Sequence, residues 1–350
     1  MYESLGFETL TAPQAAVAFA LLLGLAFGAL AQRTQFCFRR GLVGEDRRAA
    51  LGVWLTALVA AILGTQAAVA QGWITFDDHR FMASELPILG VALGGLLFGA
   101  GMVLTRGCVS RLTVLGASGN LRALTVLLVF AITAHATLKG VLAPLRTAIG
   151  GVTVDLGVTS LADLPGGAAF WSAALVVAAL VMVLRSGNRP AVLLGAALIG
   201  LLVPLGWVGT GFVLFDDFDP IAMESLSFTA PWADSLFFAI ASTAIPAGFG
   251  TGLVAGTILG AAIAALLSGS FQWTSFSAPR ETGRYLAGGT LMGLGGVLAG
   301  GCTLGAGLAG IPSLSISALL TLVAITVGAL LTQAATSPRA SRLSGLQPAE

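Results

Sequence analysis

Long apolar segments alternate with short polar loops along nearly the whole chain. A helix needs about 20 apolar residues to cross the hydrocarbon core of a bilayer. The pattern predicts nine such helices, near residues 12–31, 48–71, 86–104, 121–139, 167–185, 190–207, 242–267, 285–300 and 313–332. We therefore predict an all-α integral membrane protein with about nine transmembrane helices, because helices satisfy their own backbone hydrogen bonds in lipid.

The charged residues between these segments predict an orientation. Arginines follow every odd-numbered span, whereas the other loops are acidic or mixed. The basic positions are Arg33, Arg39, Arg40, Arg47, Arg48, Arg106, Arg111, Arg122, Arg185, Arg189, Arg280, Arg284, Arg339 and Arg342. Basic loops stay cytoplasmic, so the N-terminus is predicted outside and the C-terminus inside. That arrangement requires an odd number of spans, as counted.

Composition agrees with a membrane protein and argues against other classes. Charged residues make up 9% of the chain and the mean hydropathy is +0.94, whereas a soluble domain has about 25% charged residues. A net charge of +1 gives no indication of nucleic-acid binding. We find no nucleotide-binding motif, metal-ligand spacing or catalytic constellation, and predict no enzyme activity, cofactor or metal.

Two segments of the chain resemble each other at a constant offset of 194 residues. Residues 94–116 and 288–310 share ten of 23 positions, including the pairs Gly107–Cys108 and Gly301–Cys302. An odd connecting span inverts the second copy, as in many secondary transporters. The predicted units are a first repeat of four spans (12–140), a connector with span 5 (141–189), an inverted second repeat (190–332) and a disordered cytoplasmic tail (333–350).

After each Gly-Cys pair the chain is too short and too glycine-rich to cross the membrane. We predict half-helices at 105–119 and 299–312 that enter from opposite sides and bring Cys108 and Cys302 near the centre. Irregular backbone at that depth is tolerated where it is buried or lines a cavity. The N-termini of half-helices favour an anion, because their free N–H groups and dipole are positive.

The chain has three cysteines, Cys37, Cys108 and Cys302. Their odd number and wide spacing argue against a disulfide framework or a zinc site. A free cysteine often serves only for packing. The repeat favours a functional role for Cys108 and Cys302, while the residues alone leave Cys37 open. His135 lies within a predicted span, where a hydrogen bond between helices explains it equally well, so we assign it no role.

Three motifs resemble the YeeE/YedE family of membrane transporters: RTQFCFRRG (33–41), GAGMVLTRGC (99–108) and GGVLAGGCTLGAG (295–307). The resemblance implies a nine-span fold that narrows at its middle and imports thiosulfate across the bacterial inner membrane. It also implies that Cys37, Cys108 and Cys302 line the path of the ion. A cytoplasmic sulfur-carrier protein is a candidate partner on the same ground.

The corresponding mechanism is a relay of neutral thiols. A thiol is a weak donor with a polarizable sulfur, so it can hold a sulfur anion loosely enough to release it. We place Cys302 outermost, Cys108 next and Cys37 nearest the cytoplasm. Gly107 and Gly301 would let the backbone approach the ion. Arg106 and Arg111 could attract anions at the inner face, although the positive-inside rule explains them equally well.

Three other functions fit the sequence. The protein could transport another anion, such as sulfite, sulfide or a selenium species. It could be a membrane sulfur-transfer or redox protein that uses its thiols covalently. It could also be a non-transporting subunit that docks a partner protein.

Overall fold

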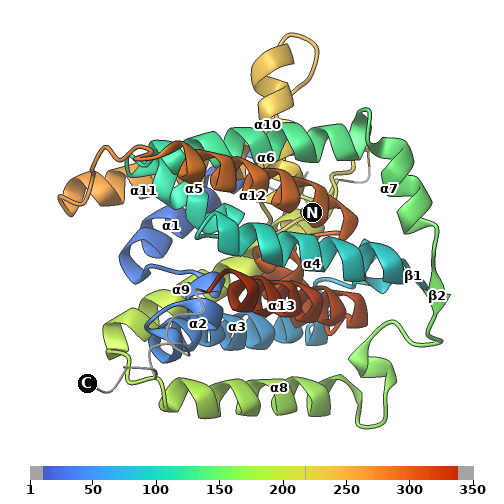
Figure 1. Cartoon of the computed structure of the whole chain (residues 1–350). Helices are drawn as coiled ribbons and strands as arrows, with labels where there is room; N and C mark the ends of the chain where they lie inside the picture. Colours follow the sequence, from blue (N-terminus) through green and yellow to red (C-terminus); the bar gives the residue numbers. More distant parts are fainter. Residues whose placement is uncertain (1–10, 217, 338–350) are drawn as a thin grey trace, which may run out of the picture.

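The computed structural model describes residues 11–216 and 218–337 (Figure 1). Nine long helices dominate it, at positions close to the nine predicted spans. They are α1 (Ala12–Thr34), α3 (Arg47–Ala70), α4 (Ile88–Leu104), α6 (Leu121–Lys139), α8 (Gly167–Leu184), α9 (Pro190–Val208), α11 (Phe249–Leu267), α12 (Pro279–Leu298) and α13 (Ile316–Thr336). Within the described ranges, eight candidate spans are long and apolar enough to cross a bilayer, and nine if the bent segment that begins with α12 is included. The predicted all-α membrane fold is confirmed.

Short elements fill the breaks between the long helices. The helices among them are α2 (Phe38–Val43), α5 (Val109–Ala117), α7 (Ala143–Gly150) and α10 (Thr229–Ala241), the π-helices η4 (Gly209–Val213) and η5 (Thr303–Gly310), and the 3-10 turns η2 (Arg80–Met82), η3 (Leu161–Asp163) and η6 (Ile311–Ser313). Strands β1 (Glu85–Leu86) and β2 (Val154–Asp155) pair antiparallel. The half-helices expected at 105–119 and 299–312 are α5 and η5 with η6.

Two short helices, α2 and α10, were not predicted from the sequence. Helix α2 has six residues and two arginines, so its segment reads as a basic loop. Helix α10 lies between the sixth and seventh predicted spans. That span was predicted from residue 242, but α11 begins at Phe249, because Pro246 and Gly248 interrupt the chain after α10.

Helix pairing is the same in the two halves of the bundle. Three helix pairs have a counterpart in the other half. The pair α1–α11 corresponds to α9–α3, and the pair α4–α13 corresponds to α12–α6. The short helices pair in the same way, α2 with α3 and α10 with α11. Helix α5 contacts α6 and α11, while η5 contacts α13 and α3. Two repeats related by a twofold axis would produce these corresponding pairs. We therefore propose the predicted repeats as the domain organisation. Residues 333–336 belong to α13, and 338–350 of the predicted tail lie outside the described residues.

Glycines allow the two halves to approach closely at the centre. A Cβ atom on Gly94 of α4 would lie 2.7 Å from the carbonyl oxygen of Gly295, and one on Gly295 of α12 would lie 2.6 Å from that of Gly94. The backbones of α4 and α12 are therefore in direct contact, as small residues permit between membrane helices.

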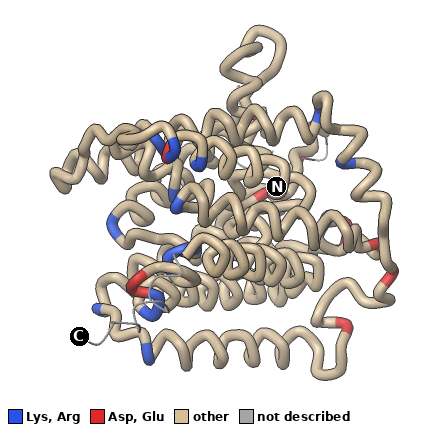
Figure 2. The backbone as a smooth tube through the Cα atoms, viewed as in Figure 1, with Lys and Arg blue, Asp and Glu red and all other residues tan. Residues whose placement is uncertain are grey.

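Charged side chains gather at the two ends of the helices. Figure 2 shows most Lys and Arg at the left and most Asp and Glu at the right. We call these the basic end, where α1 ends and α3 begins, and the acidic end, where α3 ends and α4 begins. Helix α5 joins α4 to α6 at the basic end, and η5 joins α12 to α13 at the acidic end. The two half-helices thus enter the bundle from opposite ends.

Candidate functional site

The three cysteines occupy the same position in three copies of one local structure. In each copy a long helix ends, a residue adopts a left-handed backbone two positions before the cysteine, and the cysteine caps a short helix. The left-handed residues are Gln35 (φ 51°), Arg106 (φ 59°) and Gly300 (φ 72°). Cys37 caps α2, Cys108 caps α5 and Cys302 caps η5. The left-handed residue ends the long helix and turns the chain back toward the core.

All three thiols are buried in the centre of the bundle, with exposures of 3%, 2% and 1% for Cys37, Cys108 and Cys302. Cys108 Sγ lies 3.3 Å from Ser110 Oγ, and the Gly305 N–H donates to Cys302 Sγ at 3.4 Å. The Cys108 thiol also lies within interaction range of Cys37 and of Thr303, the residue after Cys302. The structure therefore brings together three cysteines that are far apart in sequence.

Gly107 and Gly301 are buried directly before Cys108 and Cys302. A Cβ on Gly107 would lie 3.3 Å from the Leu112 side chain, and a Cβ on Gly301 would lie 3.1 Å from the amide nitrogen of Ala306. Both glycines therefore pack against the short helix that follows them. Their predicted role in approaching the ion stays a prediction.

The two arginines predicted to attract anions lie in different surroundings. Arg111, on α5, is close to Cys37 and Cys108, and its buried Nη1 has no hydrogen-bond partner among the described residues. Arg106 is exposed on the turn before Cys108. Arg39 was predicted only as a basic loop residue. Its buried Nε likewise lacks a partner in the described structure, and it lies near Cys37. The FRRG segment that begins at Phe38 was the available signal.

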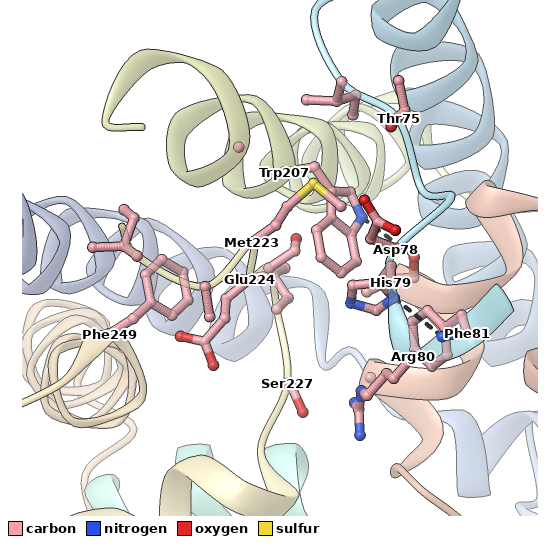
Figure 3. Close-up of a pocket in the computed structure, with 18 of the residues that line it drawn as sticks. Thr75, Asp78, His79, Arg80, Phe81, Trp207, Met223, Glu224, Ser227 and Phe249 are labelled. Atoms are coloured by element: carbon pink, nitrogen blue, oxygen red, sulfur yellow. Dashed lines mark hydrogen bonds between the residues drawn. The ribbon is translucent and has the colours of Figure 1, made fainter. Parts of the chain in front are cut away.

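A cavity of about 730 Å³ opens at the acidic end and leads toward the thiols. Its walls are the segment after α3, with Asp78, His79 and Arg80, and the segment before α10, with Glu224 and Ser227 (Figure 3). Residues of η5 also line it, among them Gly305, whose N–H donates to Cys302. Trp207 lines the same cavity and donates its indole N–H to the Ala309 carbonyl at 3.3 Å. The cavity thus reaches the helix that Cys302 caps.

Burial changes the titration of the charged groups around this cavity. His79 packs among the rings of Phe76, Phe81 and Trp207, and this desolvation lowers its pKa to about 4. His79 is therefore neutral at physiological pH. Desolvation raises the pKa of Glu224, and nearby Asp234 raises it further. No role was predicted from the sequence for His79 or Arg80.

His135, which was given no role, lies on α6 and packs against Phe237 of α10, with ring centroids 4.5 Å apart. His135 is not among the residues that line the cavity. Among the residues that the structure describes, no group of three or more His, Cys, Asp or Glu side chains is arranged to hold a metal ion.

The helices and this site define a multi-pass membrane protein with a cavity that reaches η5 and with buried thiols at the starts of short helices. Comparison with known proteins identifies the class. The chain matches the sulphur transport family over residues 33–331 and belongs to that family. It is therefore a sulfur transporter and not an enzyme, and the resemblance to the YeeE/YedE family is confirmed.

Two relatives align over most of their length. The thiosulfate transporter TsuA of Spirochaeta thermophila is 28% identical over 335 residues, which cover 88% of this chain and 95% of that protein. The thiosulfate transporter TsuA of Escherichia coli K12 is 27% identical over 327 residues, which cover 82% of this chain and 85% of that protein.

Proposed function

We propose that this protein imports thiosulfate across the bacterial inner membrane through a path lined by Cys302, Cys108 and Cys37. The observation that carries the proposal is the convergence of three capping cysteines from three short helices, which enter from both ends of the bundle. The two relatives bear the name of thiosulfate transporters, which supports the choice of substrate.

The contacts suggest an order of stations along this path. An ion in the acidic-end cavity first meets η5 and Cys302. Thr303 connects Cys302 to Cys108, and Cys108 lies against Cys37. Arg111 and Arg39 follow toward the basic end. We place the acidic end outside and the basic end in the cytoplasm, because positive loops remain cytoplasmic.

The chemistry of the stations suits a soft divalent anion. Each neutral thiol donates weakly and is polarizable, so it stabilises the terminal sulfur without holding it tightly. The N-termini of α5 and η5 add partial positive charge at Cys108 and Cys302. Arg111 offers a buried N–H that has no partner in the described structure, which an ion leaving the thiols can use. Gly107 and Gly301 belong to this proposed path.

Thiosulfate uptake by cells that lack other import routes tests the proposal. We expect Cys108→Ala and Cys302→Ala to lower uptake at least about a hundredfold, because each removes a donor in a dry passage where water cannot replace it. Thr257→Val is a matched control, since Thr257 is fully buried between α1 and α11, outside the path. Membrane-inserted protein is quantified for every variant.

Normal uptake by both cysteine variants would overturn the thiol path but leave the substrate in place. Failure of well-expressed wild type to take up thiosulfate would overturn the substrate. In that case the same assay with sulfite, sulfide and selenium anions tests the alternative solutes. The sulfur-carrier partner stays a prediction that rests on the family resemblance.

A covalent role for the thiols is the second candidate, and one observation favours it. Cys37 and Cys108 lie side by side with Arg111 nearby, and a cation beside a thiol is typical of reactive cysteines. Analysis of the imported sulfur distinguishes the two roles. A relay delivers intact thiosulfate. In covalent transfer a cysteine thiolate attacks the outer sulfur of thiosulfate, the S–S bond of thiosulfate breaks, sulfite leaves and a cysteine persulfide remains, which mass spectrometry detects.

A further inference from the structure

The acidic-end cavity is lined by an arginine and a glutamate that come from two different segments of the chain. Arg80 projects from the segment after α3 and Glu224 from the segment before α10, with the Ser227 hydroxyl on the same cavity wall as Glu224 (Figure 3). In the described part of the chain, the Arg80 guanidinium forms no salt bridge and no side-chain hydrogen bond. It is held by stacking over the Phe81 ring, 5.1 Å from its centroid.

Arg80 lies both on the wall of the cavity and close to one of the buried thiols. The Arg80 guanidinium is close enough to Glu224 and to Cys302 to interact electrostatically with both. A second cavity of about 610 Å³, lined by Arg146 and Gly300, also has Arg80 on its wall. Arg80 thus lies on the wall of both cavities and close to Cys302, without an ionic partner among the residues that the structure describes. A guanidinium is planar and suits the oxygen atoms of a tetrahedral anion.

We propose that Arg80 and Glu224 form an outer capture site for a divalent sulfur oxyanion, and that capture is strengthened when Glu224 takes up a proton. This inference rests on the proposed import function. Arg80 binds the oxygen atoms of the anion and leaves its terminal sulfur free to meet Cys302. An ionised Glu224 repels the anion, and a protonated Glu224 can donate a hydrogen bond to it.

The direction of the pH effect follows from the groups around Glu224. The charged and titratable groups that share the cavity with Glu224 are Arg80, His79 and Asp78 on the segment after α3, and Asp234 on α10 also influences it. Asp234 pairs with Lys139 of α6 at 3.6 Å. Burial and Asp234 raise the pKa of Glu224 above its ordinary value. Glu224 therefore gains its proton as the pH falls from neutral, before an exposed carboxyl would. A bound dianion favours that proton further.

The test measures thiosulfate uptake between about pH 5.5 and 8 in wild type and in variants of the two residues. Thiosulfate keeps both charges over this range, so the pH acts on the protein alone. We expect Arg80→Gln to raise KM about tenfold with a smaller change in kcat, since one charged contact is lost at the capture step. Arg80→Lys restores part of the affinity. Wild-type KM falls as the pH falls, and Glu224→Gln gives a low KM at every pH.

Two control variants separate these effects from general changes in the cavity. Asp78→Asn removes a carboxylate from the other wall of the cavity, and His79→Gln removes a histidine whose pKa of about 4 lies below the tested range. Both are expected to retain the pH dependence of the wild type. Retention of that dependence by Glu224→Gln, or its loss in Asp78→Asn, overturns the role of Glu224.

Binding of thiosulfate and of sulfate to the purified protein is measured in parallel. Equal affinities of wild type and Arg80→Gln for both anions overturn the capture site. The proposed import function fails separately from the capture site: in that case the wild type binds either anion through Arg80 but takes up no thiosulfate. Thiosulfate import with unchanged KM in Arg80→Gln leaves the proposed function intact and removes this inference.

Discussion

At the scale of single residues, the main finding is the common setting of the cysteines. Each follows a left-handed residue by two positions and caps a short helix. Glycine adopts that backbone without cost at Gly300, whereas Arg106 has a Cβ and costs about 1–2 kcal/mol there. The turn is therefore imposed by the surrounding helices at Arg106, and it places Cys108 in the core.

Burial of the thiols predicts slow chemical labelling. We expect Cys37, Cys108 and Cys302 to react with a membrane-permeable maleimide at least about tenfold more slowly than an exposed thiol, because burial limits the access of the reagent to each sulfur. The reference is a cysteine introduced at exposed Ser337. Mass spectrometry of labelled peptides over time provides the rates.

Thiosulfate should slow the labelling further if the thiols line its path. Rapid labelling of all three native cysteines in the folded protein would contradict a relay of neutral thiols and favour the covalent alternative. Unfolding in detergent should make every cysteine equally reactive, which controls for intrinsic differences between the peptides.

At the scale of elements, the broken helices depend on close contact between α4 and α12. A Cβ on Gly295 would lie 2.5 Å from the Phe98 amide nitrogen. That is too short for any carbon contact, and the neighbouring atoms are backbone. The two helices must separate to accept a side chain, which would shift Cys108 and Cys302 together because each follows one of them.

Gly295→Ala is therefore expected to destabilise the protein by about 1–3 kcal/mol. Gly283→Ala is the matched control on the same helix. A Cβ at Gly283 meets no atom within 4 Å, so this change should be neutral or add up to about 1 kcal/mol through helix propensity. Thermal unfolding in detergent compares both with wild type. Equal unfolding midpoints for the two variants would mean that the contact between α4 and α12 is not tight.

At the scale of the whole molecule, the separation of charge predicts the orientation in the membrane. Helix α13 ends at the basic end, so we expect the C-terminus in the cytoplasm. A green fluorescent protein fused there should fluoresce, and an alkaline phosphatase fused there should be inactive. A fusion after Asp78, at the acidic end, should give the opposite result. Reversed signals at both sites would place the acidic-end cavity on the cytoplasmic side. The proposed order of stations would then favour export over import.

The sequence by itself determined the membrane class, the approximate positions of nine long helices and the two half-helices. Each of these features depends on local properties: apolar length, loop charge, and a Gly-Cys segment too short to span. The start of α11 was misplaced because the break at Pro246 and Gly248 was absorbed into an apolar stretch. The small α2 was missed because six residues carry too little periodicity to distinguish a helix from a basic loop.

Only the tertiary structure decided which residues meet. Segments separated by many residues meet in the contact of Cys37 with Cys108, in the cavity that reaches η5, and in the placement of Arg80 and Glu224 on the walls of that cavity. Such contacts depend on helix pairing, and pairing between membrane helices is set by backbone approach at residues such as Gly94 and Gly295. The apolar length of a segment is enough to place it in the bilayer. It does not show which other helix that segment approaches.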